Sequence, residues 1–278
     1  MCAVIENTNT RSGDYGNLLT APRPGHGDYP GFIRYNGFND IRGGGHFSGR
    51  LTAPIVFAGS VCRQILEKKG IKIASHIQSV GKVCDSRFNP LKIDEGLIDS
   101  LNKQSFPVID PSSEPKMREY IENARMSQDS TGGVIECVAT GVPAGIGSPM
   151  FGGVENLISS IMFGIPAVKG IEFGAGFAIT EMLGSQANDQ YAYDENGRVV
   201  TLSNNNGGIT GGITNGMPIL FRIAVKPTPS ISKPQQTVDL TKHENTELVI
   251  HGRHDPCIVP RATVVAESAL AIALINLL

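Results

Sequence analysis

Hydrophobic residues recur at helical or strand spacing along most of the chain after residue 52. Between Ile55 and Leu66 they follow a helical period that begins after Thr52 and Pro54 and ends at Gly70, which predicts a helix. The same analysis predicts further helices at residues 91–101, 113–126, 154–163 and 262–278, and strands at 71–77, 134–139, 167–173, 219–225 and 247–250. Because helices and strands alternate without a regular repeat, the pattern favours a layered α+β domain.

The first 51 residues lack this periodicity. Glycine and proline cluster at 22–27, 30–31 and 43–45, so we expect loops with little core of their own. Residues 269–278 are strongly apolar but fall short of the ~20 residues that a membrane span requires. The polar N-terminus has no basic region of the kind that begins a secretory signal.

Composition narrows the class of protein. The 278-residue chain has 24 Lys and Arg against 26 Asp and Glu, a formal charge of −2, so no overall field attracts nucleic acid or an anionic membrane. The five cysteines are odd in number and widely spaced, as expected for reduced thiols in a cytoplasmic protein. Glycine is frequent, with 33 residues, which indicates sharp turns or close backbone approaches to a ligand.

The cations before residue 51 are all arginine, at positions 11, 23, 34, 42 and 50. Arginine binds phosphate or carboxylate through two parallel hydrogen bonds, so this glycine-rich stretch is a candidate anion-binding surface. The alternative is that these arginines are solvated or pair with Asp14, Asp28 and Asp40. Spacing alone leaves both interpretations open.

Two later segments carry the residue types of a polar binding site. Residues 204–216 are rich in glycine, and Lys226 with the hydroxyls of Thr228 and Ser230 follows the next predicted strand, which suits a phosphate; a wide turn between strands is the alternative. In residues 251–257, Arg253 and Asp255 share one face of an extended backbone and are able to orient a polar ligand together. A metal site formed by the histidines and the cysteine of that segment is a further alternative.

Several separate strings, in one order along the chain, together resemble the chorismate synthase family. They are NTNTRSGDY (7–15), RPGHGDY (23–29), GVPAGIGSP (141–149), AVKGIEFGAGF (167–177), GGITGGITNGMPI (207–219), KPTPSI (226–231) and GRHDPC (252–257). Independent strings so far apart rarely arise together by chance, and the resemblance runs from Asn7 to the C-terminus.

The resemblance implies a fold, a reaction and a cofactor. The fold is a layered β-α-β sandwich with helices packed between sheets, and residues 1–278 form a single domain that assembles as a cytoplasmic homotetramer. The reaction is the trans 1,4-elimination of phosphate from 5-enolpyruvylshikimate 3-phosphate, which gives chorismate in the shikimate pathway. Reduced FMN is required although no net oxidation occurs. NADP enters only through the resemblance, because no nicotinamide fingerprint is present, and the source of flavin reduction stays open.

The family's catalytic and substrate-binding positions fall on particular residues here. His26 corresponds to a catalytic histidine that acts as a general acid, and Asp255 to the group that assists proton removal near the flavin. Arg23, Arg50 and Arg253 correspond to substrate-binding arginines. From the residues alone, the alternatives are that His26 only hydrogen-bonds a loop and that Asp255 only orients Arg253.

The cofactor-binding positions also carry over one by one. The flavin-binding residues implied are His46, Phe47, Ser48, Pro166, Ala167, Gly211, Lys226, Pro227, Thr228, Pro229, Ser230 and Arg253, with residues 226–230 around the FMN phosphate. His46 stands where the family has arginine, so one fixed charge is lost and its role is open. Ser48 has an alternative as a helix cap.

The family has a segment before the position of Asn7, with a GESHG motif and the other catalytic histidine, that this chain lacks. Residues 2–5 then correspond to the remainder of a strand, and we expect open sheet edges. Three hypotheses follow: a truncated or split chorismate synthase with weak or no catalysis as given, a non-catalytic FMN-binding fragment, or a metal hydrolase centred on residues 251–257.

Overall fold

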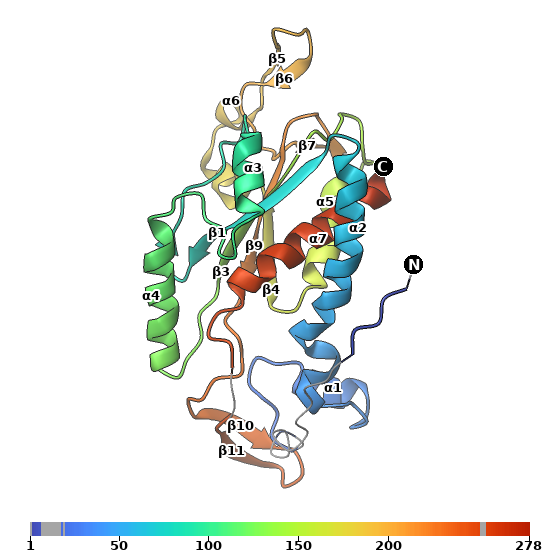
Figure 1. The fold of residues 1–278 in the computed structure, drawn as a ribbon. Coiled ribbons are helices and arrows are strands. Elements are labelled where there is room, and N and C mark those ends of the chain that lie inside the picture. Colours follow the sequence, from blue (N-terminus) through green and yellow to red (C-terminus); the bar gives the residue numbers. More distant parts are fainter. Residues whose placement is uncertain (1, 7–17, 19, 251–253) are drawn as a thin grey trace.

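The fold is built on one five-stranded antiparallel sheet, seen in a computed structural model that describes residues 2–6, 18, 20–250 and 254–278 (Figure 1). Its strand order is β2-β1-β3-β9-β4. These strands are β1 (Lys72–Val80), β2 (Val83–Cys84), β3 (Gly133–Thr140), β4 (Val168–Phe173) and β9 (Ile219–Val225). Three two-stranded sheets accompany it: β5 (Tyr191–Tyr193) with β6 (Val199–Thr201), β7 (Ile209–Thr210) with β8 (Ile213–Thr214), and β10 (Gln235–Asp239) with β11 (Glu244–Leu248).

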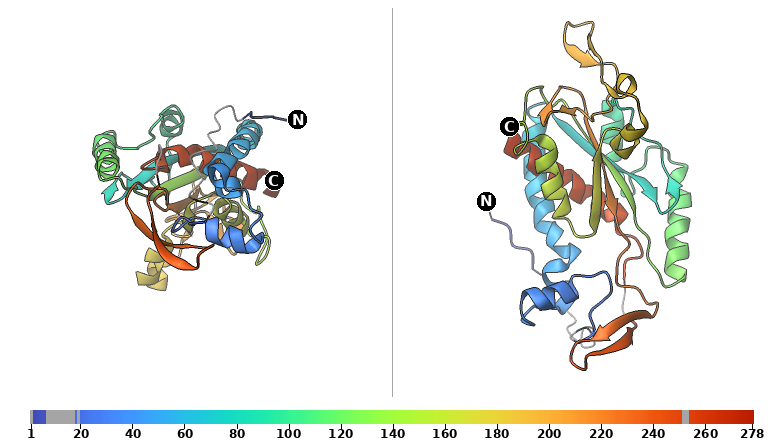
Figure 2. Two further views of the ribbon diagram at one scale, coloured as in Figure 1. Left: turned by 90° about the horizontal axis from the view of Figure 1, so that it is seen from below. Right: turned by 180° about the vertical axis from the view of Figure 1, so that it is seen from behind.

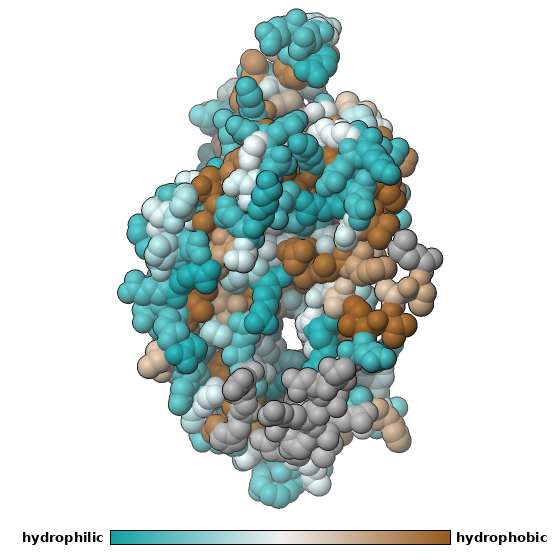
Figure 3. All heavy atoms as spheres, viewed as in Figure 1, coloured by the Kyte–Doolittle hydropathy of each residue, from teal (hydrophilic) through white to brown (hydrophobic). Residues whose placement is uncertain are grey.

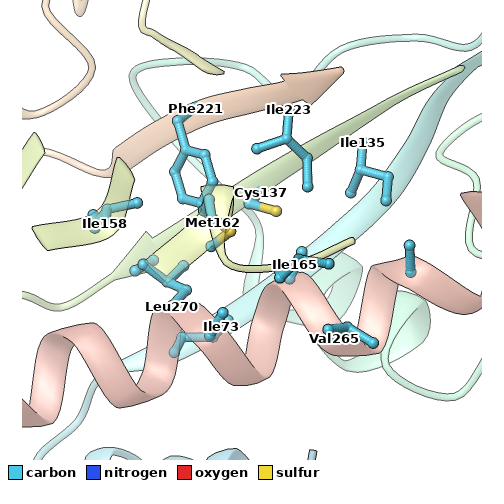
Figure 4. Packing of buried hydrophobic residues seen from close by; sticks show 14 of the residues in the cluster. Ile73, Ile135, Cys137, Ile158, Met162, Ile165, Phe221, Ile223, Val265 and Leu270 are labelled. Carbon is cyan, nitrogen blue, oxygen red and sulfur yellow. The ribbon is translucent and has the colours of Figure 1, made fainter. Parts of the chain in front are cut away.

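Helices pack on both faces of the large sheet. The helices are α1 (Asp28–Arg34), α2 (Ala53–Glu67), α3 (Glu95–Leu101), α4 (Ser113–Met126), α5 (Val154–Phe163), α6 (Gly184–Ala187) and α7 (Val259–Leu277), with 3-10 turns η2 (Arg42–Phe47), η3 (Gly49–Thr52) and η4 (Gly176–Glu181). Alternate residues of β1, β3 and β9, such as Ile73, Cys137 and Phe221, point toward α7 and α5 and form the main core (Figure 4). The α+β class predicted from the sequence is confirmed.

Helix α7 is the centre of this core. It contacts α2, α5, β1 and β3, and twelve of its residues are buried. Glu267 is buried too, and it is satisfied by Arg63 Nη1 at 2.7 Å and by the backbone amide and hydroxyl of Ser75, each at 2.9 Å. Among the described helices, α7 alone is long and apolar enough to cross a membrane, and 67% of that stretch is buried inside the protein. Its apolar character therefore serves the core.

The other face of the sheet carries a row of charged residues in register. His76 of β1 pairs with Glu136 of β3, Glu136 with Arg222 of β9, and Arg222 with Glu172 of β4. His76 Nε2 lies 2.9 Å from a Glu136 carboxylate oxygen, and Arg222 donates to Glu172 at 2.6 Å. The other ring nitrogen of His76 meets Asp85 at 3.1 Å. Paired positions share a face of the sheet, so opposite charges alternate across four strands.

Helix α1, turn η2 and the β10–β11 hairpin lie at one end of the sheet, and the β5–β6 hairpin projects from the opposite end (Figures 1 and 2). Strand β9 runs between the two ends. Figure 3 shows polar residues over much of one face, with hydrophobic residues collected along α2 and α7. Phe57 and Ile65 of α2 and Val264 of α7 are exposed.

Most predicted elements are confirmed. The helices at 113–126 and 154–163 and the strand at 219–225 have the expected bounds. The helix predicted at 91–101 begins only at Glu95, because the Asp94 side chain accepts a hydrogen bond from the Gly96 amide at 2.6 Å and caps it there. The strand predicted at 247–250 instead ends at Leu248.

Two predictions for the N-terminal part are wrong. Residues 2–6 form no strand, and they are exposed. Residues 28–34 form the helix α1, although a loop was expected there. Phe47 supports this helix by packing against the backbone of Gly27 and Gly31, a contact between distant residues that local sequence does not encode.

The core position of α7 gives a stability prediction. Truncating the fully buried Leu270 to alanine removes packing against the sheet, so the free energy of unfolding falls by about 2–5 kcal/mol. The matched control is Val264→Ala on the same helix, where the side chain is 45% exposed. Urea unfolding at one fixed protein concentration compares them, and equal losses for the two variants contradict this role of α7.

The buried row predicts a pH dependence of stability. Burial lowers the pKa of His76, but hydrogen bonds to Asp85 and Glu136 outweigh this and raise it above 6.5. The resulting stabilisation is fully present below about pH 6.5 and is lost as pH rises through the raised value. Urea unfolding between pH 6 and 9 tests this: His76→Gln removes the alkaline decline, and His243→Asn, at an exposed histidine, keeps it. A decline that persists in His76→Gln assigns it to another group.

Candidate active site

A pocket of about 580 Å³ lies at the end of the sheet where β9 finishes and β4 begins. Its lining comes from segments that are far apart in the sequence: the turn before α1, turn η2, the connection from α5 to β4, the segment after β9 and the segment before α7. Twelve residues predicted from the sequence line it: Arg23, His26, His46, Phe47, Ser48, Pro166, Ala167, Lys226, Thr228, Pro229, Ser230 and Asp255. The structure therefore brings most of the predicted site into one cavity.

Other predicted site residues lie elsewhere. Gly211 is at the tip of the β7–β8 hairpin, at the far end of β9 from the pocket, because the whole length of that strand separates it from Lys226. Arg50 does not line the pocket; its Nε donates to the hydroxyl of Ser48 at 3.1 Å and the contact is exposed. Pro227 is exposed between two lining residues. Arg253 falls outside the described residues.

The turn before α1 is closed by an ion pair. Gly25 has a φ of +71°, which lets the chain reverse so that the His26 amide donates to the Arg23 carbonyl at 3.2 Å. Asp28 then accepts from Arg23 Nε at 2.7 Å and Nη2 at 2.9 Å, and its Oδ1 lies 2.6 Å from His26 Nδ1. The predicted alternative that this arginine pairs with Asp28 is confirmed.

Electrostatics keep Asp28 charged. Its side chain is 6% exposed, and burial alone raises the pKa of its carboxyl group. The hydrogen bonds and charges of Arg23 and His26 outweigh burial, so the pKa of Asp28 lies far below its usual range. An ionised carboxylate therefore lies behind Arg23 and His26, the two side chains that line the pocket.

Phe47 forms an apolar wall of the pocket. Its ring packs so closely on α1 that a Cβ at Gly27 would lie 2.6 Å from Phe47 Cγ, and one at Gly31 would lie 2.7 Å from Cε2. The ring also meets His26 edge-on at 6.1 Å between centroids. Next to it, Ser48 caps η3 by accepting from the Arg50 amide at 3.3 Å, so the cap predicted as an alternative is present while Ser48 still lines the pocket.

The segment after β9 supplies a cation and hydroxyls. Lys226 Nζ donates to the Gly25 carbonyl, and Ser230 Oγ accepts from Arg23 Nη1 at 3.2 Å. Partial burial, with the nearby charge of Lys169 adding to it, lowers the pKa of Lys226 from 10.5. These contacts bind the segment to the Arg23 turn across the pocket.

Asp255 lies in the segment just before α7. One of its oxygens accepts from the Cys257 amide at 3.1 Å and the other lies 3.3 Å from Arg261 Nε, while its carbonyl accepts from Thr228 Oγ1 at 2.9 Å. The side chain is 26% exposed. Its orientation is therefore set by α7 and by the segment after β9.

The connection between α5 and β4 closes another side. Ala167 has a φ of +75°, and its carbonyl accepts from the Lys226 amide at 2.9 Å, which fixes this turn beside the cation. Sequence reasoning missed further lining residues here and nearby, namely Phe163, Gly164, Ile165, Gly44, His254 and Ile258. For residues 163–165, the available signal was the Gly-Ile-Pro string that follows the helix predicted at 154–163.

These features define an enzyme-type pocket for an anionic small molecule. A concave, partly apolar cavity holds fixed cations, hydroxyls and a histidine, as ligand sites do. In the part of the chain that the structure describes, no group of three or more His, Cys, Asp or Glu is arranged to hold a metal ion.

Comparison with known proteins identifies the family. The family model for chorismate synthase matches residues 1–278. The chorismate synthase of Pyrococcus abyssi is 47% identical over 274 residues, 99% of this chain and 75% of the relative. That of Thermococcus kodakarensis is 46% identical over 271 residues, 98% of this chain and 74% of the relative. That of Dehalococcoides mccartyi strain 195 is 43% identical over 277 residues, 100% of this chain and 75% of the relative.

A solved structure agrees. A crystal structure of chorismate synthase superposes with a TM-score of 0.74 and 31% identity, covering 90% of this chain and 70% of that chain. The protein therefore belongs to the chorismate synthase family. Its function is that of a chorismate synthase, a lyase of aromatic biosynthesis that acts on a small molecule. The comparisons do not favour the alternative of a non-catalytic fragment.

The wall formed by Phe47 gives a prediction about the pocket. In Gly27→Ala the new Cβ forces the ring away, which costs about 1–3 kcal/mol and speeds amide exchange in α1 roughly tenfold or more. Gly49→Ala is the matched control, since it also lines the pocket and its Cβ meets nothing within 4 Å. Hydrogen exchange with mass spectrometry on peptides covering 27–35 compares them. Equal exchange in both variants contradicts the contact.

Proposed function

We propose that this protein catalyses the trans 1,4-elimination of phosphate from 5-enolpyruvylshikimate 3-phosphate, with reduced FMN bound in the pocket. In this reaction the carbon–oxygen bond to phosphate breaks, a ring proton leaves, and a second ring double bond forms, so chorismate and phosphate balance the substrate without net oxidation. The convergence of Arg23, His26, Lys226 and Asp255 on one cavity carries the proposal.

The residues present suit a flavin mononucleotide. The pocket volume of about 580 Å³ falls in the range of roughly 300–1,000 Å³ usual for ligand sites. Phe47 and the backbone at Pro166 and Ala167 offer apolar surface for a flat ring. Lys226, Thr228 and Ser230 offer a cation and hydroxyls for a phosphate. A planar apolar body with one anionic end fits this division of the lining.

We assign the cofactor-binding role to the segment after β9 and to turn η2. Lys226 would hold the FMN phosphate with Thr228, Pro229 and Ser230 around it, and Ser48 would contact the flavin. When bound there, reduced FMN would supply an electron transiently to the substrate and recover it. His46, in place of the family's arginine, donates a hydrogen bond when protonated but adds no permanent charge.

The anionic substrate is assigned to the arginine side of the pocket. Arg23 is buried and its position is fixed, so its charge is in place before phosphate departs, which favours the leaving group. His26 acts as the general acid that keeps the flavin or the departing phosphate protonated. Asp255, held by Cys257 and Arg261, assists removal of the ring proton.

Three features of the proposal extend beyond the pocket. Arg50 and Arg253 are assigned to substrate and Gly211 to the flavin on the strength of family motifs alone, because Arg50 and Gly211 do not line the pocket and Arg253 falls outside the described residues. We propose that residues 1–278 act as one domain within a cytoplasmic homotetramer. NADP is retained as a source of electrons for the flavin.

The test measures FMN binding and phosphate release together. Quenching of FMN fluorescence gives Kd, and an anaerobic assay with 5-enolpyruvylshikimate 3-phosphate gives phosphate, which we expect only with reduced flavin. Lys226→Ala removes a charged hydrogen bond worth about 1.5–3 kcal/mol, so Kd for FMN rises roughly tenfold to a hundredfold. Lys226→Arg, which keeps the charge, recovers part of the loss.

The control is a neighbouring lysine. Lys169 of β4 is exposed and lies outside the pocket lining, yet its charge acts on Lys226, so Lys169→Ala tests general electrostatics. Kd for FMN changes little in that variant. Equal weakening by both alanine variants, or phosphate release that is independent of reduced FMN, would overturn the assignment.

A further inference from the structure

Asp28 saturates its hydrogen-bonding capacity on two residues of the pocket. Its Oδ2 accepts from Arg23 Nε at 2.7 Å and from the Arg23 backbone amide at 3.1 Å. Its Oδ1 accepts from Arg23 Nη2 at 2.9 Å and lies 2.6 Å from His26 Nδ1. A carboxylate offers about four acceptor positions, and all of them are directed to these two side chains and one amide. Asp28 itself does not line the pocket.

This geometry fixes the tautomer of His26. An ionised carboxylate only accepts hydrogen bonds, so at 2.6 Å the proton of the pair lies on Nδ1. Arg23 Nη2 also lies 3.1 Å from Nδ1 and only donates, so without the carboxylate it would favour the opposite tautomer. Asp28 therefore selects the Nδ1–H tautomer of His26, whereas Arg23 alone would select the Nε2–H tautomer.

The nitrogen that Asp28 does not engage is the one available for chemistry. Nε2 lies on the far side of the ring, next to Gly44, where a Cβ would come within 3.6 Å of it, and both residues line the pocket. Among the described residues, the charged groups in hydrogen-bond contact with the ring are Arg23 and Asp28, with Lys226 on the neighbouring Gly25 carbonyl. With Nδ1 protonated, neutral His26 presents an unprotonated Nε2 and the imidazolium presents Nε2–H.

We propose that Asp28 is a positioning residue that holds His26 with Nδ1 protonated and Nε2 toward the ligand, and that holds Arg23 beside it with Nη1 toward Ser230. This inference rests on the proposed function for its catalytic consequence, but the tautomer it specifies is a property of the ligand-free protein. A single carboxylate thus sets the direction of proton exchange and the place of a phosphate-binding charge.

The variant Asp28→Asn separates this role from simple support of the fold. Asparagine keeps one acceptor oxygen for Arg23 Nε and the backbone amide, but places an NH₂ group against Nδ1 of His26. Nδ1 must then accept a hydrogen bond, so the ring changes to the Nε2–H tautomer. The expected result is that Nε2 no longer accepts a proton to form the imidazolium that acts as the general acid, while the turn remains formed.

Nitrogen NMR of the ligand-free, ¹⁵N-labelled protein measures the tautomer directly. His26 signals are identified by their absence in His26→Gln. We expect Nδ1–H in the wild type, with a proton shifted downfield by the short hydrogen bond, and Nε2–H in Asp28→Asn. His76, which is fully buried and bonded at both nitrogens, keeps its signals in every variant and shows that the fold is intact.

The matched control is another aspartate paired with an arginine. Asp194 accepts from Arg198 Nε at 2.9 Å, but it lies in the exposed turn between β5 and β6, at the opposite end of the sheet. Asp194→Asn leaves the His26 spectrum and phosphate release unchanged. In Asp28→Asn, we expect kcat for phosphate release to fall roughly a hundredfold or more, with a smaller change in KM.

The outcomes distinguish this inference from the proposed function. An unchanged His26 tautomer in Asp28→Asn, with the His76 signals intact, overturns the inference whatever the activity. A changed tautomer with kcat unaffected in an active wild type overturns its catalytic part. A wild type that neither binds FMN nor releases phosphate contradicts the proposed function and leaves the tautomer result to stand or fall by itself.

Discussion

Strand β9 is hydrogen-bonded on both sides, and this double pairing determines where the pocket forms. Val225, its last residue, is in register with Gly133 at the start of β3 and with Val168 at the start of β4. A Cβ on Gly132 would lie 2.3 Å from the Val225 carbonyl, so the chain leaves β9 against bare backbone. Lys226 therefore emerges at one fixed point, beside the turn at Ala167. The register of the sheet thus fixes the position of the Lys226 cation without any contribution from a ligand.

The same strand explains why one predicted site residue lies far from the rest. β9 spans seven residues, so at a rise of about 3.3 Å per residue its first and last residues lie about 20 Å apart. Gly211 precedes the strand and Lys226 follows it. Motifs that neighbour each other in the sequence are therefore held at opposite ends of the sheet within one chain, and only the later one reaches the pocket.

Sequence patterns predicted the helices and strands that bury one of their own faces. They failed where packing between distant segments determines the local structure. Helix α4 and strand β9 have the expected bounds because their apolar spacing encodes them. Helix α1 was missed because its glycine and proline disfavour a helix locally, while the packing of Phe47 from η2 that supports it is a contact between distant residues. The same holds for the site. Motif strings identified Arg23, His26 and Lys226, and the spacing allowed a pair between Arg23 and Asp28, but nothing in the sequence indicates that Asp28 bonds to His26 as well.

Two histidines of this chain show how similar partners give different roles. His76 bonds to carboxylates at both ring nitrogens and has no exposed surface, so every proton it exchanges is coupled to the stability of the sheet. His26 bonds to a carboxylate at Nδ1, is 11% exposed, and turns its other nitrogen toward a cavity. A buried network satisfied on every side locks strands together. His26 is bonded to a carboxylate on one side only, so its Nε2 remains available to a molecule in the pocket.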